Sequence, residues 1–359
     1  MNRVVNFGPG PAVLPEEVLT WASEGVRELG SCGMSVLEIS HRAGEYRSIQ
    51  DEARERVLRL LRLDPLDFTV MFLGGGASLQ FYMAPLNFIG ADGHAAYIDT
   101  GVWSRKAMEQ ARRVGGVEVI ASSKGDAYAM LPDVAIPAPG ACYVHITTNN
   151  TIEGTQWRVL PESGTTPLIA DASSDFLACD RSGSALSMIY AGAQKNAGPA
   201  GVTVVAAKRS FLATAREDVP EMLSYRVHER EDSVYNTPPV FGVYIVRLVC
   251  KWIEEQGGVA AMEAANKAKA DLVYGALDSH PDVYEPTVTV AAHRSHVNLT
   301  FRLCDPTRED AFMDGARDRG MVGLRGHRAV GGFRASMYNA FPMAWAERFA
   351  DYLEAFARG

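Results

Sequence analysis

The segment FTVMFLGGGASLQF, residues 68–81, sets the fold prediction for the whole chain. An apolar run of strand length comes first, three glycines follow, and a helical pattern comes after them. This order predicts a strand-to-helix turn whose backbone N–H groups, near Gly76, Ala77 and Ser78, converge on a phosphate. A tight turn without a ligand is the alternative explanation. The spacing matches neither GxGxxG nor GxxxxGK(S/T), so it indicates neither a dinucleotide site nor a P-loop.

The same alternation of apolar runs and helical patterns continues downstream. Further apolar runs occupy residues 95–99, 117–120, 142–147, 167–171, 187–192 and 202–207. Continuous apolar runs that alternate with helices are typical of a mostly parallel sheet whose two faces are covered by helices. We therefore predict an α/β fold built on one large seven-stranded sheet, with ligands beyond the carboxyl ends of its strands.

The regular alternation of strand-like and helical patterns ends near residue 260. We predict a strand at 296–303, and helices at 15–30, from 45, at 239–255, 259–277 and 307–319, and from 343. We expect residues 15–260 to form a large domain. Residues 1–14 and 261–359 are expected to form a smaller α+β domain.

Composition excludes several classes of function. Among 359 residues, 35 are Lys or Arg and 43 are Asp or Glu, which gives a net charge of −8. Neither nucleic acid nor an anionic membrane is therefore an expected partner. The five cysteines are odd in number and contain no CxxC pair, which is typical of a reducing compartment. Since a signal peptide and a membrane span are also lacking, we expect a cytoplasmic protein, and we expect no metal site.

Two candidate catalytic residues end predicted strands. The run PLIAD ends at Asp171, and SMIYAGAQK ends at Lys195. A lysine and a carboxylate at this edge of a sheet suit pyridoxal phosphate, because the lysine binds its aldehyde and the carboxylate keeps its pyridine nitrogen protonated. A solvated loop lysine and a helix N-cap aspartate are the alternative explanations for Lys195 and Asp171.

A cluster of cationic side chains stands out in this acidic chain. Arginine pairs with carboxylate and phosphate groups through two parallel hydrogen bonds, so the cluster suits a substrate that carries both groups. A solvated basic loop is the alternative explanation. The cluster comprises His41, Arg42, Arg325, His327, Arg328 and Arg334.

Eight motifs, in this order and spread nearly end to end, resemble the phosphoserine aminotransferase family. They are NFGPGPAVLP (6–15), GMSVLEISHR (33–42), GGGASLQF (74–81), NNTIEGTQW (149–157), ADASSDFL (170–177), GAQKNAGPAG (192–201), NTPP (236–239) and GLRGHRAVGGFRASMYNA (323–340). The resemblance implies a fold-type I pyridoxal-phosphate enzyme. It also implies a homodimer with active sites at the subunit interface, and glutamate as the amino donor.

The resemblance assigns roles to the cofactor-binding residues. Lys195 resembles the lysine that forms the Schiff base, Asp171 the partner of the pyridine nitrogen, and Trp103 the ring that stacks on the cofactor. Without the motif, core packing explains Trp103 as well. Gly76, Ala77, Ser78 and Gln194 are expected at the phosphate, Thr151 at the phenolic oxygen, and Asn236 and Thr237 at the phosphate of the neighbouring subunit.

The resemblance also assigns the substrate side. Arg334 is expected to bind the α-carboxylate that both substrates share. His41, Arg42, His327 and Arg328 are expected to bind the phosphate of one substrate and the distal carboxylate of the other. His41 and Arg42 would come from the second subunit.

The implied reaction is reversible transamination between 3-phosphohydroxypyruvate and L-glutamate, which gives O-phospho-L-serine and 2-oxoglutarate in serine biosynthesis. Another small-substrate aminotransferase, of the alanine or serine–glyoxylate type, and a non-catalytic homologue that binds pyridoxal phosphate are the alternatives. A second phosphorylated substrate, on the route to vitamin B6, stays open. Three features depart from the family: Glu153 replaces a frequent aromatic residue, Arg325 replaces a lysine, and the segment after Tyr338 differs.

Overall fold

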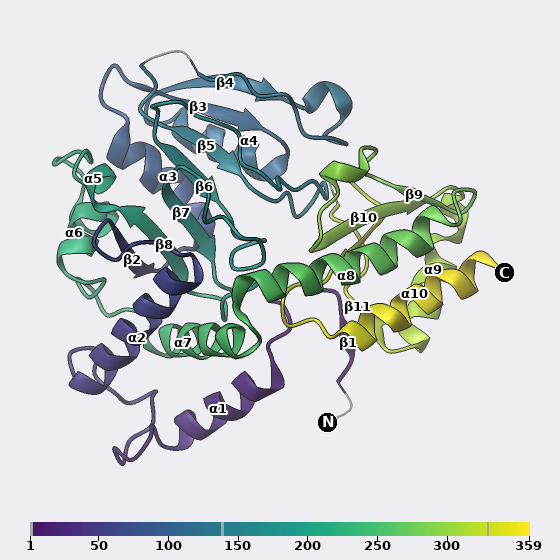
Figure 1. Ribbon diagram of the computed structural model, residues 1–359, viewed down its shortest axis with the longest axis horizontal. Coiled ribbons are helices and arrows are strands. Elements are labelled where there is room, and N and C mark those ends of the chain that lie inside the picture. Colours follow the sequence, from purple (N-terminus) through teal and green to yellow (C-terminus); the bar gives the residue numbers. More distant parts are fainter. Residues whose placement is uncertain (1–2, 138–139, 329) are drawn as a thin grey trace.

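A seven-stranded sheet forms the centre of the computed structural model, which describes residues 3–137, 140–328 and 330–359 (Figure 1). Its strands run in the order β2-β8-β7-β6-β5-β3-β4. They are β2 (Phe68–Leu73), β3 (His94–Asp99), β4 (Gly116–Ser122), β5 (Val144–Thr147), β6 (Leu168–Asp171), β7 (Leu186–Gly192) and β8 (Thr203–Lys208). Neighbours pair in parallel except at β8, which is antiparallel to both β2 and β7. The predicted mostly parallel α/β sheet is confirmed.

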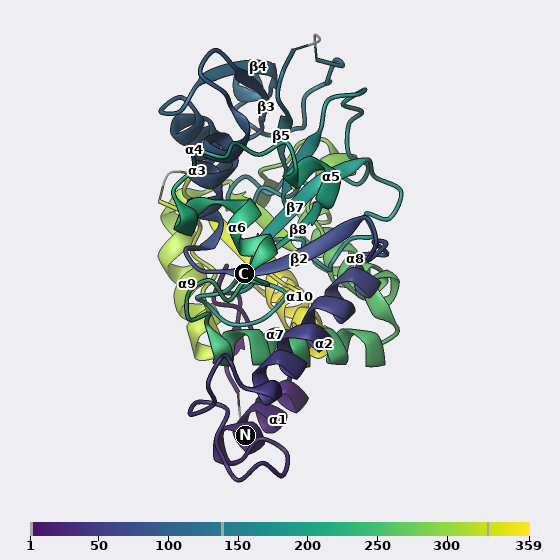
Figure 2. The same cartoon turned by 90° about the vertical axis from the view of Figure 1, so that its left-hand side faces the viewer.

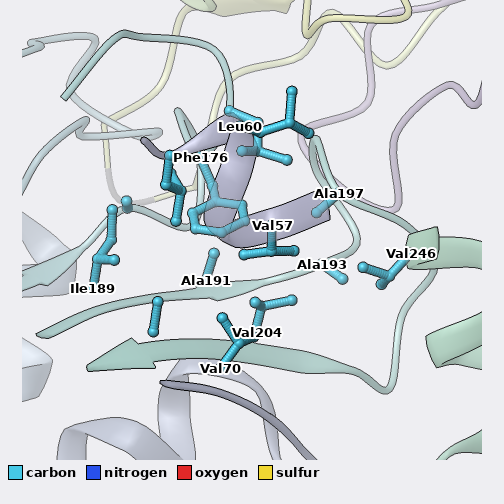
Figure 3. Close-up of a cluster of buried hydrophobic side chains, with 14 of the residues drawn as sticks. Val57, Leu60, Val70, Phe176, Ile189, Ala191, Ala193, Ala197, Val204 and Val246 are labelled. Carbon is cyan, nitrogen blue, oxygen red and sulfur yellow. The ribbon is translucent and has the colours of Figure 1, made fainter. Parts of the chain in front are cut away.

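Helices cover both faces of this sheet because its strands are apolar on both sides. Along β2 all six residues are buried. Val70 packs into the core beneath α2 (Gly44–Leu60) and α7 (Val240–Glu255), which lie side by side (Figure 1 and Figure 2). Figure 3 shows Val70 in this core, next to Val204 of β8 and Val57 of α2. Met71 faces the opposite core, beneath α3 (Gly76–Phe88) and α4 (Val102–Ala111).

The turn between β2 and α3 follows the predicted order of strand, glycines and helix. Gly75 caps α3 with a positive φ of 83°, which glycine adopts without strain. A Cβ at this position would lie 2.5 Å from Leu79 Cδ2. The turn therefore requires glycine at 75 and brings the N-terminus of α3 to the carboxyl edge of the sheet.

A second core is built from the two ends of the chain. Phe7 packs there against residues between 270 and 353. Two small sheets support this core: β12-β10-β9, which is antiparallel, and the parallel pair β1-β11. Their strands are β1 (Val5–Asn6), β9 (Tyr284–Pro286), β10 (Asn298–Leu303), β11 (Met321–Val322) and β12 (Phe333–Ser336).

The helix α8 (Gly258–Asp278) joins the two cores. Met262 belongs to the first core, whereas Val273 belongs to the second. Lys269, between them, is buried and donates hydrogen bonds to the carbonyl oxygens of Tyr338 at 2.7 Å and Phe341 at 3.1 Å. We propose the domain division at residue 260, with residues 1–14 in the smaller domain, on the basis of these two cores.

The remaining helices are α1 (Glu16–Arg27), α5 (Arg209–Leu212), α6 (Tyr225–Arg230), α9 (Glu309–Asp318) and α10 (Met343–Ala357). The predicted helices lie within a few residues of these bounds and of those of α2, α7 and α8. The first one ends at Arg27 rather than near Gly30, because the chain enters an extended conformation at Glu28. Over the described ranges, a helix with the length and apolar character to span a membrane is not found.

Phe301 tests the energetics of the second core. Its ring is fully buried and lies 5.3 Å from the ring centre of Phe333 and 5.9 Å from that of Phe312. We expect Phe301→Ala to lower the free energy of unfolding by about 3–5 kcal/mol, since a cavity replaces the ring. Urea denaturation measures the change. Leu66→Ala, at a side chain that is 82% exposed, is the control and should change it by less than about 0.5 kcal/mol. Equal effects of both substitutions would contradict the assignment of this core.

Candidate functional site

A cavity of about 270 Å³ opens at the carboxyl edge of the large sheet and extends to the second core. It brings together ten of the residues predicted from the sequence. These are Gly76, Ala77, Ser78, Trp103, Thr151, Asp171, Gln194, Lys195, His327 and Arg334. The strands β5 and β6 pair so that Thr147 and Asp171 are opposite each other, and both line the cavity.

Lys195 lies in the turn after β7 and points into the cavity. Its Nζ donates a 2.8 Å hydrogen bond to Thr151 Oγ1. Gly10 approaches its stem so closely that a Cβ there would lie 3.3 Å from Lys195 Cγ. Burial lowers the pKa of Lys195 to about 8, although the carboxylate of Asp171 opposes this effect. An enclosed amine with a lowered pKa is not a solvated loop lysine, and it is partly in the nucleophilic, neutral form near pH 8.

Asp171 ends β6 and its side chain is buried beside the cavity. Its Oδ1 accepts hydrogen bonds from Ser173 N–H at 3.0 Å and from the Ser173 hydroxyl at 2.7 Å. Within the described residues both bonds reach the same oxygen, which leaves Oδ2 for a ligand. Burial raises the pKa of Asp171, while the two bonds from Ser173 and the charge of Lys195 lower it. Turns rather than an α-helix follow this residue, so the helix N-cap explanation is wrong.

Trp103 is the second residue of α4 and forms a wall of the cavity. The centre of its ring lies 5.8 Å from Lys195 Nζ and 4.7 Å from Lys106 Nζ. The indole also packs against the core beneath α3, 6.4 Å from the ring centre of Phe81. Both explanations offered by the sequence therefore describe this residue: it is a core contact and a surface of the pocket.

The N-terminus of α3 supplies backbone donors. The first N–H groups of a helix have no partner inside the helix, and the positive end of its dipole favours an anion. Gly76, Ala77 and Ser78 occupy this first turn and line the cavity together with Gln194. An amine, a buried carboxylate, an aromatic wall and an anion cradle thus meet in one cavity, and this set fits pyridoxal phosphate.

Arg334, on β12, brings a cation into the same cavity. One of its terminal nitrogens donates to the carbonyl oxygen of Thr151 at 3.2 Å. Its Nε is buried, and no partner for it is found in the described part of the chain. Burial lowers the pKa of Arg334. An incompletely paired guanidinium in a pocket is suited to bind a carboxylate.

The other cationic residues divide into two groups. His327 lines the cavity, and burial together with the charges of Arg334 and Arg328 lowers its pKa. Arg328 is exposed and lies outside the lining, and Arg325 pairs with the exposed Asp310 at 3.3 Å. Of these cationic residues, His327 therefore belongs to the wall of the pocket, whereas Arg325 and Arg328 belong to the solvated surface.

Besides Arg328, four predicted residues lie outside the cavity of this chain. His41 and Arg42 are in the turn that precedes α2, and Asn236 and Thr237 precede α7. Asn236 and Thr237 are exposed, as is Arg42. A single chain therefore does not bring these four residues to the pocket.

Sequence reasoning missed several lining residues. They are Pro9, Gly10, Thr147, Asn149, Ile152, Ser173 and Ser174. A signal for Thr147 was present, because the predicted strand 142–147 ends there and a parallel strand end belongs at this edge. Gly10 had no such signal, since its approach to Lys195 joins segments 185 positions apart in the chain.

The comparisons with known proteins agree with this geometry. The family model Aminotransferase class-V matches residues 4–349. The curated phosphoserine aminotransferase of Geobacillus kaustophilus is 45% identical over 361 residues, which cover 100% of this chain and 99% of the relative. Both the predicted family resemblance and the predicted fold class are confirmed.

Solved structures give the same result. Phosphoserine aminotransferase from Bacillus circulans subsp. alkalophilus superposes with a TM-score of 0.96 at 42% identity, over 100% of this chain and 99% of that chain. The structure described as PLP-bound phosphoserine aminotransferase from Trichomonas vaginalis superposes with a TM-score of 0.88 at 35% identity, over 98% and 100% of the two chains.

The lowered pKa of Lys195 predicts how its reactivity depends on pH. In the protein without cofactor, labelling of Lys195 by pyridoxal, trapped with borohydride and quantified by mass spectrometry, should rise with pH to a midpoint at about 8. Below this midpoint the reactive amine decreases about tenfold per pH unit. Asp171→Asn removes the charge that favours the ammonium form and should move the midpoint to lower pH. A midpoint near the ordinary lysine value of 10.5 would contradict the enclosed geometry.

Proposed function

This chain belongs to the aminotransferase class-V family, and we propose that it transfers an amino group between L-glutamate and 3-phosphohydroxypyruvate. The products are 2-oxoglutarate and O-phospho-L-serine, the reaction is reversible, and its place is serine biosynthesis. The relatives named phosphoserine aminotransferase match this chain over nearly its full length, which supports the substrate class. The observation that carries the proposal is one cavity that holds Lys195, Asp171, His327 and Arg334.

Pyridoxal phosphate, the cofactor of this enzyme, supplies an electron sink for the charge left on Cα when its proton is removed. Lys195 is the residue that moves this proton. Its amine has a pKa of about 8, so it both accepts and returns a proton near neutral pH. The hydroxyl of Thr151, 2.8 Å away, fixes the position of Nζ. The same hydroxyl would donate to the phenolic oxygen of the cofactor.

Asp171 and the helix α3 fix the two ends of the cofactor site. Among the described residues Oδ2 of Asp171 has no partner, so it would pair with the ring nitrogen, and burial of this carboxylate would strengthen that pairing. The amides of Gly76, Ala77 and Ser78, together with Gln194, bind the phosphate at the positive end of the helix. Trp103, which lines the cavity, would cover the ring and exclude water from one of its faces.

The cations at the opening of the cavity select the substrate. Arg334 would bind the α-carboxylate, because its guanidinium lines the cavity and is only partly hydrogen-bonded within the described part of the chain. His327 and Arg328 bind the phosphate of phosphoserine and, in the other half of the reaction, the distal carboxylate of glutamate. A substrate without a second anionic group would lack the charge that pairs with Arg328 and accepts a hydrogen bond from His327.

We propose a homodimer with shared active sites. His41 and Arg42 of the partner subunit would add to the substrate phosphate site, and Asn236 and Thr237 of the partner subunit to the cofactor phosphate site. The position of these four residues outside the cavity of their own chain supports this arrangement. All five cysteines are free thiols in the structure, which supports the proposal of a cytoplasmic enzyme.

A spectroscopic titration tests the substrate. When O-phosphoserine is added to the cofactor-loaded protein, we expect the visible absorption band of the bound cofactor to be lost, whereas serine and alanine should change it little. His327→Asn should raise the phosphoserine concentration needed for half of this change by about 10- to 100-fold, because a charge-assisted hydrogen bond is lost. Arg317→Gln, at an exposed residue paired with Asp314, is the control. Equal responses to serine and phosphoserine would favour the alanine or serine–glyoxylate type of enzyme.

Lys195→Ala tests the assignment of the proton-moving group. We expect the turnover number for transamination to fall by at least about 10³-fold, because no other amine is placed to move the proton. Binding of pyridoxal phosphate, measured by equilibrium dialysis, should persist, since the phosphate cradle and Asp171 are intact. Lys267→Ala, at an exposed lysine paired with Asp271, should retain full activity. Near-normal turnover by the Lys195 variant would overturn the assignment.

A further inference from the structure

Glu153 is a buried carboxyl group at the N-terminus of α4, next to the pocket but not in its lining. Its Oε1 accepts the N–H of Val102 at 2.7 Å. Val102 is the first residue of α4 and directly precedes Trp103. A Cβ on Gly101 would lie within 2.6 Å of both carboxyl oxygens of Glu153. The carboxyl group therefore reaches the helix only because residue 101 is glycine.

The backbone of Glu153 is tied to the pocket and to the second core. Thr151 and Ile152, the two residues before it, line the cavity. Its carbonyl oxygen accepts a 2.9 Å hydrogen bond from the hydroxyl of Thr300 on β10. Glu153 thus connects the segment that holds the Lys195 amine to the first turn of the helix that carries the aromatic wall.

The other side of this turn is also fixed. The Ser104 hydroxyl accepts the N–H groups of Thr100 and Gly101, each at 3.0 Å, and lies 3.2 Å from Asp99 Oδ1. Ser104, which follows Trp103, is therefore tied to the backbone that leads into the helix, and Glu153 binds the N–H of Val102, which precedes Trp103. With the two neighbours of Trp103 held in this way, the direction of its indole depends on both contacts.

We propose that Glu153 is a positioning residue for Trp103, and that its carboxyl group determines where the indole lies over the bound cofactor without touching the cofactor. An acceptor at the first N–H of a helix stabilises its first turn. A negative charge there adds a favourable interaction with the helix dipole. The inference concerns cofactor binding and holds whichever amino acid is the substrate.

The surroundings of Glu153 make this contact sensitive to pH. Burial raises its pKa to about 7, the Val102 N–H and Arg105 lower it, and Asp99 raises it. Tyr128 and Arg334 also face this carboxyl group, each close enough for electrostatic interaction. Its Oε2 is buried, and the described residues offer it no hydrogen-bond partner. Near neutral pH both protonation states are populated, and the ionised state binds the helix N-terminus more strongly.

The test measures the dissociation constant of pyridoxal phosphate by equilibrium dialysis, on protein stripped of cofactor, at pH 6 and pH 8. Glu153→Ala should weaken binding about 10-fold, since the acceptor is lost and a buried N–H is left unpaired. Glu153→Gln keeps an oxygen acceptor without charge. It should match the unchanged protein at pH 6 and bind about 3-fold more weakly at pH 8.

A matched control and a spectroscopic readout separate positioning from general loss of stability. Glu263→Ala removes another carboxylate that accepts a backbone N–H, that of Asp180 at 3.0 Å, and neither residue lines the cavity. It should leave cofactor affinity unchanged. Visible circular dichroism of the bound cofactor should change in Glu153→Ala and recover in Glu153→Gln.

Two results would overturn the proposal. One is wild-type affinity and an unchanged dichroism spectrum in Glu153→Ala. The other is an equal loss of affinity in Glu263→Ala. If Glu153→Ala does not fold, the dissociation constants of Glu153→Gln and of the unchanged protein are compared at the two pH values. The same change of this constant with pH in both proteins would refute the inference.

Discussion

The parallel pairing of β3, β5, β6 and β7 is the constraint on which the site depends. Parallel strands end at the same edge of a sheet, so residues that follow separate strands meet there although they are far apart in sequence. Asp171 ends β6, Thr147 ends β5, and Lys195 follows β7. Since both faces of the sheet are covered by helices, this edge is the place where polar groups reach a cavity without passing through a core.

Burial shifts the pKa values of the ionisable groups at this edge of the sheet. Removal from water disfavours the ammonium form of Lys195 and the ionised form of Asp171, and each opposes the shift of the other by its charge. The hydrogen bond from the Ser173 hydroxyl holds Asp171 in place, and the hydrogen bond that Lys195 donates to Thr151 holds the amine in place. Arg334 joins them from the second core, so the site is completed only when the two cores pack together.

Much of this arrangement could be predicted from the sequence, because long apolar runs and strand ends are local signals. The large sheet, Asp171 and Lys195 were found in this way. The strand β12 was not, since its four residues carry no pattern of their own and pair with β10 across a segment that contains α9 and β11. Nor could sequence separate His327, which lines the cavity, from Arg328, because neighbouring loop residues point in different directions.

Contacts between distant segments were also beyond prediction. Glu153 looked like a departure in a motif, whereas its position against Val102 depends on Gly101, about fifty positions earlier. The roles proposed for His41, Arg42, Asn236 and Thr237 require a second chain. Neither kind of contact leaves a periodic signal in one sequence.

The continuity of α8 has a mechanical consequence. A 21-residue helix is a rod about 30 Å long, and this one has one end in each core. Lys269 binds it to the segment directly after β12, the strand that carries Arg334. A rotation of the second core against the first must therefore bend this helix. The same rotation would change the distance between Arg334 and Lys195. The separation of Arg334 from Lys195 thus depends on the relative tilt of the two cores.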